Sequence, residues 1–136
     1  MADIKIKTGV ETYNIRDEKD NIIGVLEFNP VDSNILKRYQ TVVDAFNNFK
    51  AEETGDDIAD VNKMSDFVEN QFDFLLGYPV SKGIFGQLGA LTPCGDGTVY
   101  FVNVLNAIGD IIESTTKKRT AKINAQVNKA MEKYRK

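Results

Sequence analysis

The chain has no histidine and no tryptophan, and Cys94 is the only cysteine among its 136 residues. Without histidine it lacks the commonest general base, the usual activator of a nucleophilic serine or cysteine, and the commonest transition-metal ligand. One cysteine cannot form a disulfide within the chain or build a usual structural zinc site. No basic residue adjoins Cys94 to activate its thiol. We therefore expect no catalytic residue, no cofactor and no metal site, in a protein that is not an enzyme.

Long apolar runs are absent as well. No stretch approaches the roughly 18 consecutive apolar residues of a membrane span, and the N-terminal MADIKIKTGV holds no apolar core of the signal-peptide type. Hydrophobic residues make up 42% of the chain and charged residues 27%, which is the balance of one ordinary globular domain. The sequence therefore predicts a cytoplasmic protein that makes no contact with a membrane.

Positive charge is scarce in the body of the chain and concentrated at its end. Residues 117–136 contain eight basic residues and one acidic residue, a net charge of +7, whereas the rest has nine basic and nineteen acidic residues, a net charge of −10. An acidic body with a basic tail indicates a contact surface for a nucleic acid, an acidic surface or a second copy of the chain. A solvated lysine-rich helix is the alternative interpretation.

Two β-prone segments, residues 8–17 and 22–28, flank a polar turn at 17–21 and predict a β-hairpin. Pro30 ends the second strand because it has no N–H group to donate to the ladder. Either Asp32 or Ser33, with Asp32 favoured, is then expected to cap the helix that follows.

Three stripes of apolar residues at helical spacing come next. The first covers residues 35–49, the second runs from near Asp56 to Gly77, and the third begins near residue 96 or 98. A short helical turn is expected around Ile84, within a glycine-rich segment. Together these patterns predict an α+β fold, in which an N-terminal β-hairpin packs on three to four helices and the C-terminal helix is long.

The helical spacing continues into the basic tail. We divide the chain into a hairpin and helical body, residues 1–116, and a basic helical extension, residues 117–136, which either belongs to the same domain or protrudes from it. The candidate partner-binding residues of the extension are the apolar Ile123, Val127, Met131 and Tyr134 and the basic Lys122, Lys129 and Lys133. Regular apolar spacing with one aromatic residue makes nucleic acid an unlikely partner and favours a protein.

Two clusters have the composition of ligand sites but lack the required spacing. The acidic residues at 52–60 do not match the calcium-binding loop of an EF-hand. The glycines at 83, 86 and 89 lack the G-K-[ST] ending of a phosphate-binding loop. A solvated linker with a helix start, and flexible turns, are the favoured interpretations.

A hairpin, the motif F-N-P-x-D and a helix carrying Arg-Tyr occur here in that order. The positions concerned are Phe28, Asn29, Pro30, Asp32, Arg38 and Tyr39, followed by GIFG at 83–86 and KAMEKYRK at 129–136. In these motifs the chain resembles the small tail assembly chaperones of long-tailed phages and prophages of Gram-positive bacteria. The four positions Phe28, Asn29, Pro30 and Asp32 form the candidate structural junction.

The resemblance implies a non-enzymatic role in building a phage tail, in the cytoplasm of the host cell. Proteins of that family coat the long helical tape-measure protein before the tail tube polymerises around it, and they are absent from the finished virion. The implied partner is therefore the tape-measure protein or another tail component, and a homo-oligomer is a further expectation. The alternatives are a minor structural tail or connector protein, and a nucleic-acid-binding regulator that uses the basic tail.

Overall fold

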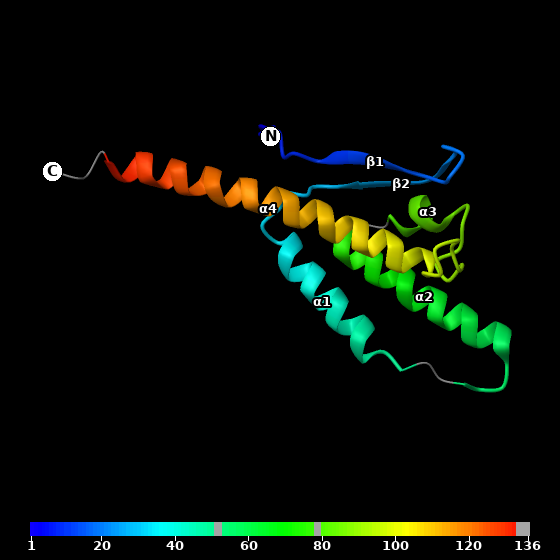
Figure 1. The fold of residues 1–136 in the computed structure, drawn as a ribbon. Coiled ribbons are helices and arrows are strands. Elements are labelled where there is room, and N and C mark those ends of the chain that lie inside the picture. Colours follow the sequence, from blue (N-terminus) through cyan, green and yellow to red (C-terminus); the bar gives the residue numbers. More distant parts are fainter. Residues whose placement is uncertain (51–52, 78–79, 133–136) are drawn as a thin grey trace.

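A computed structural model describes residues 1–50, 53–77 and 80–132. Within them the element order is β1 (Glu11–Arg16), β2 (Ile22–Phe28), α1 (Ile35–Asn48), α2 (Asp57–Leu76), α3 (Ser81–Phe85) and α4 (Tyr100–Glu132). Figure 1 shows the hairpin along one side of α4, with α1 and α2 running in opposite directions on the other. This arrangement confirms the predicted α+β fold with an N-terminal hairpin and a long C-terminal helix.

The hairpin forms as the alternation predicts, although β1 begins three residues later than expected. The register pairs Tyr13 with Leu26 antiparallel, which places their side chains on the face toward the helices. Asp17 closes the turn, since its Oδ1 accepts hydrogen bonds of 2.9 Å from the backbone N–H groups of Lys19 and Asn21. These bonds hold the pKa of Asp17 below its usual value, with the bond from Asn21 contributing most.

One core joins the hairpin to all four helices of the described chain. Its largest fully buried side chains are Phe28, Phe72, Ile35, Leu75, Ile84, Ile108, Val42 and Val68. Phe85 of α3 packs edge-on against both Phe72 and Tyr100, with ring centroids 5.1 and 5.7 Å apart. Because α3 sits at the centre of this aromatic group, the short helix closes the core beneath the hairpin.

The hairpin and α3 approach each other through backbone atoms. A Cβ atom at Gly24 would lie 2.9 Å from the carbonyl oxygen of Ile84, so a larger residue would force the two apart. The Tyr100 hydroxyl donates to the same oxygen at 3.0 Å. Asp73 of α2 fixes the start of α3 by accepting from the backbone N–H groups of Val80 and Ser81 at 2.8 Å.

Both ends of α2 form as predicted. Asp56 is the N-cap, and its side chain accepts from the backbone N–H of Ala59 at 3.1 Å. Gly77 ends the helix with a φ of 84°, a left-handed conformation that glycine adopts without a steric penalty. The acidic cluster here has a structural use, since Asp60 accepts from the Thr54 hydroxyl at 2.7 Å.

The prediction that Asp32 or Ser33 caps α1 is wrong. The helix begins at Ile35, and its N-cap residue is Asn34, whose side chain makes no capping hydrogen bond. Asp32 instead accepts from the backbone N–H of Asn34 at 2.9 Å, which makes a local turn ahead of the helix. Short polar side chains bond readily to nearby backbone in this way, and the turn delays the helix by two residues.

The predicted start of α4 near residue 96 or 98 is also early. Asp96 accepts from the backbone N–H of Thr98 at 2.9 Å, and the backbone N–H of Cys94 donates to the Thr98 carbonyl at 3.0 Å. These bonds make a turn, so the helix begins only at Tyr100.

Replacing Phe28 by alanine is expected to cost about 3–5 kcal/mol of unfolding free energy, because a fully buried aromatic ring is lost and a cavity remains. Val25 lies on the outer face of the same strand with 39% of its surface exposed, so Val25→Ala should cost less than about 1 kcal/mol. Denaturant melts of the two variants make the comparison. Equal losses would contradict the assignment of the two faces.

Candidate functional site

The strand–helix junction, residues 29–34, is held by its own side chains. The Asn29 side chain bridges two segments, since its Nδ2 donates to the Thr8 carbonyl at 2.6 Å and its Oδ1 accepts from the backbone N–H of Val31 at 3.0 Å. Pro30 is buried. The junction is therefore rigid at the point where the chain passes from the sheet to α1.

Arg38 connects the junction to the end of α2. Its guanidinium lies 3.1 Å from the Asp32 carboxylate, and its Nε donates to the Leu75 carbonyl at 2.9 Å. That carbonyl belongs to the last turn of α2, where backbone oxygens have no partner within the helix and a cation is favourable. The hydrogen bond from the Asn34 backbone, followed by the interaction with Arg38, holds the pKa of Asp32 below its usual value.

Two side chains of α4 also contact the junction. We call the junction, together with Arg38, Thr115 and Arg119, the joint. Arg119 donates to the Val31 carbonyl at 2.9 Å. The Thr115 hydroxyl lies 3.1 Å from the Pro30 carbonyl and shares its single proton with the carbonyls of Ile111 and Ile112, at 2.9 and 3.1 Å in its own helix. The junction thus lies against α1, α2 and α4 at once. Nothing in the sequence points to Thr115, and charge alone groups Arg119 with the basic tail.

Tyr39 is the remaining motif residue on α1, and it faces α4. A Cβ atom at Gly109 would overlap the Tyr39 hydroxyl, so glycine is what lets the tyrosine lie against this helix. The positions Phe28, Asn29, Pro30, Asp32, Arg38 and Tyr39 all have structural contacts here, in the core or in the joint. These contacts give each of the six residues a structural role.

Beyond the joint, α4 continues without a break and leaves the body of the protein (Figure 1). Its apolar residues Ile123, Val127 and Met131 are 49%, 52% and 52% exposed. They are spaced four residues apart and so lie along one side of the helix. Lys122 and Lys129 are exposed as well, but at 100° per residue they lie on the opposite side of the helix from this row. The other two candidates, Lys133 and Tyr134, lie outside the described residues.

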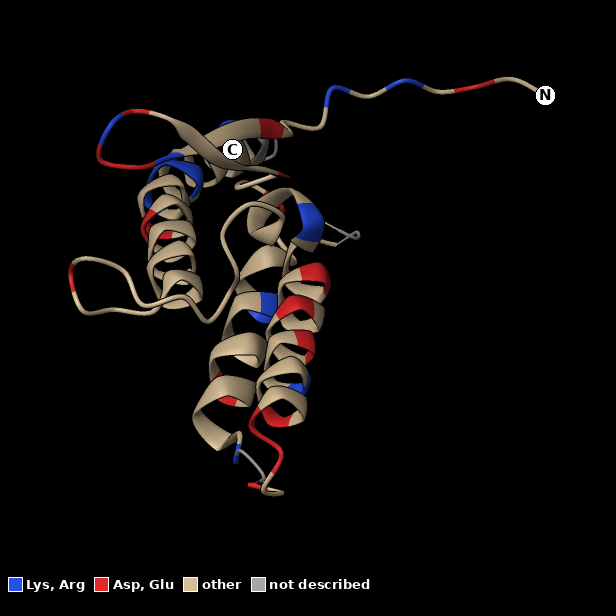
Figure 2. Ribbon diagram, turned by 90° about the vertical axis from the view of Figure 1, so that its right-hand side faces the viewer, with Lys and Arg blue, Asp and Glu red and all other residues tan. Residues whose placement is uncertain are grey.

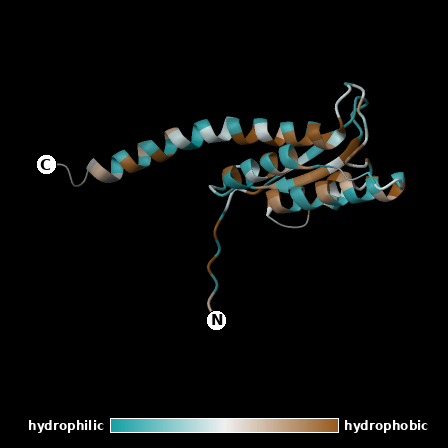
Figure 3. Cartoon of the chain, turned by 90° about the horizontal axis from the view of Figure 1, so that it is seen from below, coloured by the Kyte–Doolittle hydropathy of each residue, from teal (hydrophilic) through white to brown (hydrophobic). Residues whose placement is uncertain are grey.

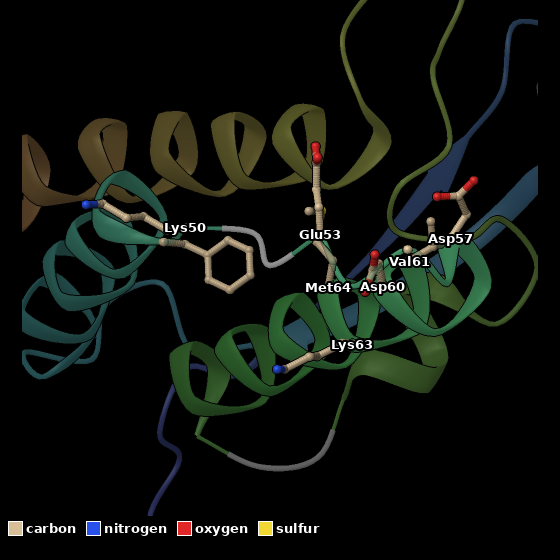
Figure 4. Close-up of a pocket in the computed structure, with 9 residues that line it drawn as sticks. Lys50, Glu53, Asp57, Asp60, Val61, Lys63 and Met64 are labelled. Atoms are coloured by element: carbon tan, nitrogen blue, oxygen red, sulfur yellow. The ribbon is translucent and has the colours of Figure 1, made fainter.

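A second open surface lies at the far end of the α1–α2 pair. A cleft of about 810 Å³ separates the end of α1 from the start of α2, and its lining includes Phe49, Val61 and Met64 (Figure 4). Charged residues of both signs also line it: Lys50, Glu53, Asp57, Asp60 and Lys63. The predicted apolar stripe of α2 reaches this end without being covered, since Ile58 and Val61 are 76% and 52% exposed.

Acidic residues follow α2, whereas the basic residues of α4 lie toward its C-terminal part. Figure 2 shows the Asp and Glu residues, in red, spaced along α2. Among the described residues no group of three acidic or cysteine side chains is placed to hold a metal ion. Within the same part of the chain, no helix combines the length and the apolar character needed to cross a lipid bilayer.

Comparison of the chain with protein-family models, with curated proteins and with solved structures found no match. The geometry of the joint and of the exposed part of α4 therefore carries the functional argument, together with the motif resemblance.

Replacing Asp32 by asparagine is expected to lower stability at pH 7 by no more than about 1 kcal/mol, because the side chain is 33% exposed and water screens its ion pair. A carboxylate whose pKa is lowered by folding stabilises the fold above its unfolded-state pKa, near 3.8, and loses this effect as the pH falls through the folded-state value. The difference between the wild type and Asp32→Asn should therefore shrink between pH 5 and pH 3. Denaturant melts across that range test it, with Asp3→Asn in the exposed N-terminal segment as the control.

Proposed function

We propose that this protein is a non-enzymatic tail assembly chaperone of a phage or prophage, which binds the helical tape-measure protein in the host cytoplasm. The observation that carries the proposal is the uncovered apolar row of Ile123, Val127 and Met131 on the part of α4 that leaves the body. These apolar side chains lie outside the core of their own chain. The motif resemblance names the class of partner.

The contact would be one helix against another. Residues 117–132 extend about 24 Å along the helix axis, enough for the apolar row to meet several turns of a partner helix. Apolar burial supplies most of the affinity in such contacts, while charge guides orientation and the rate of association. Lys122 and Lys129 lie on the opposite side of the helix from the row, so they add a general attraction for an acidic partner without contacting the residues that flank its apolar side.

Nucleic acid fits this surface less well. Phosphate binding needs cations that are available, and Arg119 already donates to the Val31 carbonyl within the joint. Phosphate contacts also make no use of a regular apolar row. A minor structural tail protein would use the same surface, and it differs from a chaperone in being present in the finished particle.

Changing both Val127 and Met131 to serine is expected to abolish binding to the tape-measure protein, because most of the exposed apolar row is lost. The double variant Ala121→Ser and Ala125→Ser adds the same hydroxyl groups on the opposite side of the helix, where both residues are exposed, and should bind normally. Co-purification of a tape-measure segment with each variant, over a salt series from 50 to 500 mM, gives the measurement.

The same proteins should be titrated with nonspecific duplex DNA. Salt should weaken tape-measure binding less than the serine substitutions do, whereas phosphate binding would fall steeply with salt. Tail-dependent DNA binding without tape-measure binding would defeat the proposal. Recovery of the protein in purified virions would replace the chaperone with a structural tail component.

A further inference from the structure

The first ten residues form an extended arm that leaves the body of the protein (Figures 2 and 3). Ile4, Ile6 and Val10 of the arm are 89%, 72% and 47% exposed. They alternate with polar residues, including Lys5 and Lys7, which is the period of a strand buried on one side. The arm therefore has the residue pattern of a β-strand, although it is not part of the sheet of β1 and β2.

The sheet has an edge that can accept such a strand. It has two strands, and among the described residues β1 pairs only with β2. The backbone edge of β2 at Gly24 and Val25 lies against α3, where a Cβ atom at Gly83 would be 2.9 Å from the Val25 carbonyl oxygen. The outer edge of β1 is left with backbone groups that can template a further strand.

An apolar groove lies beside this edge. It has a volume of about 390 Å³ and runs between the hairpin, the loop before α4 and α4 itself. The residues of its lining that matter here are Ile15, Leu26, Leu88, Pro93, Val104 and Ala107. Its volume is in the range of sites that enclose a small ligand, which is ample for two isoleucine side chains. Arg16, Asp17 and Glu18 line its hairpin end, where the two carboxylates outnumber the one cation.

We propose that the arm of one copy adds as a strand to the β1 edge of a second copy and places Ile4 and Ile6 in this groove. Residues two apart on a strand point to the same side about 7 Å from each other, so both isoleucines can enter one groove. Lys5 and Lys7 then alternate outward, at the end of the groove where acidic residues outnumber basic ones. Backbone bonds to the edge supply affinity in this mode of binding, and the pocketed side chains supply specificity.

A second copy is the occupant because of where the arm begins. It directly precedes β1 in the chain and points away from the body (Figure 3). The Asn29 side chain fixes its base by donating to the Thr8 carbonyl at 2.6 Å. The groove lies near the opposite end of β1, at residues 15–18. Each copy offers one arm and one groove, so a reciprocal exchange closes a symmetric dimer.

The single cysteine provides a direct test, since Cys94 also lines the groove. Ile6→Cys should form a disulfide with Cys94 of the second copy under mild oxidation, and it should run as a dimer on a non-reducing gel. Lys5→Cys points to the other side of the arm and should form far less dimer, and Ile6→Cys combined with Cys94→Ser should form none of this product. A disulfide within one chain, or equal cross-linking from positions 5 and 6, would overturn the proposal.

A second measurement leaves the arm unchanged. Ala107 is exposed at the groove, and its neighbour Asn106 is exposed outside it, so arginine can replace either without entering the core. Ala107→Arg should block the groove and raise the dimer dissociation constant about 100-fold or more, whereas Asn106→Arg should leave it unchanged. Analytical ultracentrifugation over a concentration series measures both. A wild-type chain that stays monomeric, or an Ala107→Arg variant that dimerises normally, would refute the arm exchange. The groove is separate from the exposed row of α4. A result that refutes the arm exchange therefore does not bear on the proposed binding of the tape-measure protein.

Discussion

The arrangement of the protein depends on the contact between α4 and the strand–helix junction, where side chains of the helix meet backbone carbonyl groups. Arg119 donates to the Val31 carbonyl, and the Thr115 hydroxyl shares its single proton between the neighbouring Pro30 carbonyl and carbonyls of its own helix. Pro30 has no N–H group, so the junction has one backbone donor fewer than an ordinary segment. Side chains of α4 supply hydrogen bonds to its carbonyl groups instead. On the other side of the junction, Arg38 ties it to the last turn of α2. The hairpin, the α1–α2 pair and α4 consequently share one joint, and α4 leaves the body next to it.

Most of the fold was predictable because local patterns and tertiary packing agree. Gly77 ends α2 and Asp56 caps it for reasons that involve only neighbouring residues. The hairpin faces follow from alternation, which places Leu26 and Phe28 inside. The N-cap of α1 was mispredicted because three consecutive polar residues, 32–34, compete for the same backbone donors, and the sequence does not say which bond wins. The ion pair between Asp32 and Arg38 appears only once the helix has formed.

For the candidate site, the sequence pattern indicated the exposed residues of α4 but not the hydrogen bonds between distant segments. The exposed row Ile123, Val127 and Met131 follows from helical spacing. The role of Arg119 does not, because its partner lies 88 residues earlier in the chain. The groove beside β1 is likewise assembled from the hairpin, a loop and α4, and no short stretch of sequence contains it. Such sites arise from packing between segments that have no common local pattern.

The unbroken course of α4 has a mechanical consequence. Its first half is anchored in the core by residues such as Ile108, and the same helix continues through the joint into open solvent. The thirteen residues from Thr120 to Glu132 form a lever about 20 Å long, because a helix rises about 1.5 Å per residue. A rotation of about 10° at the joint would move its far end by roughly 3 to 4 Å. The buried first half of α4 and its contacts with Pro30 and Val31 would together set the direction in which the lever points.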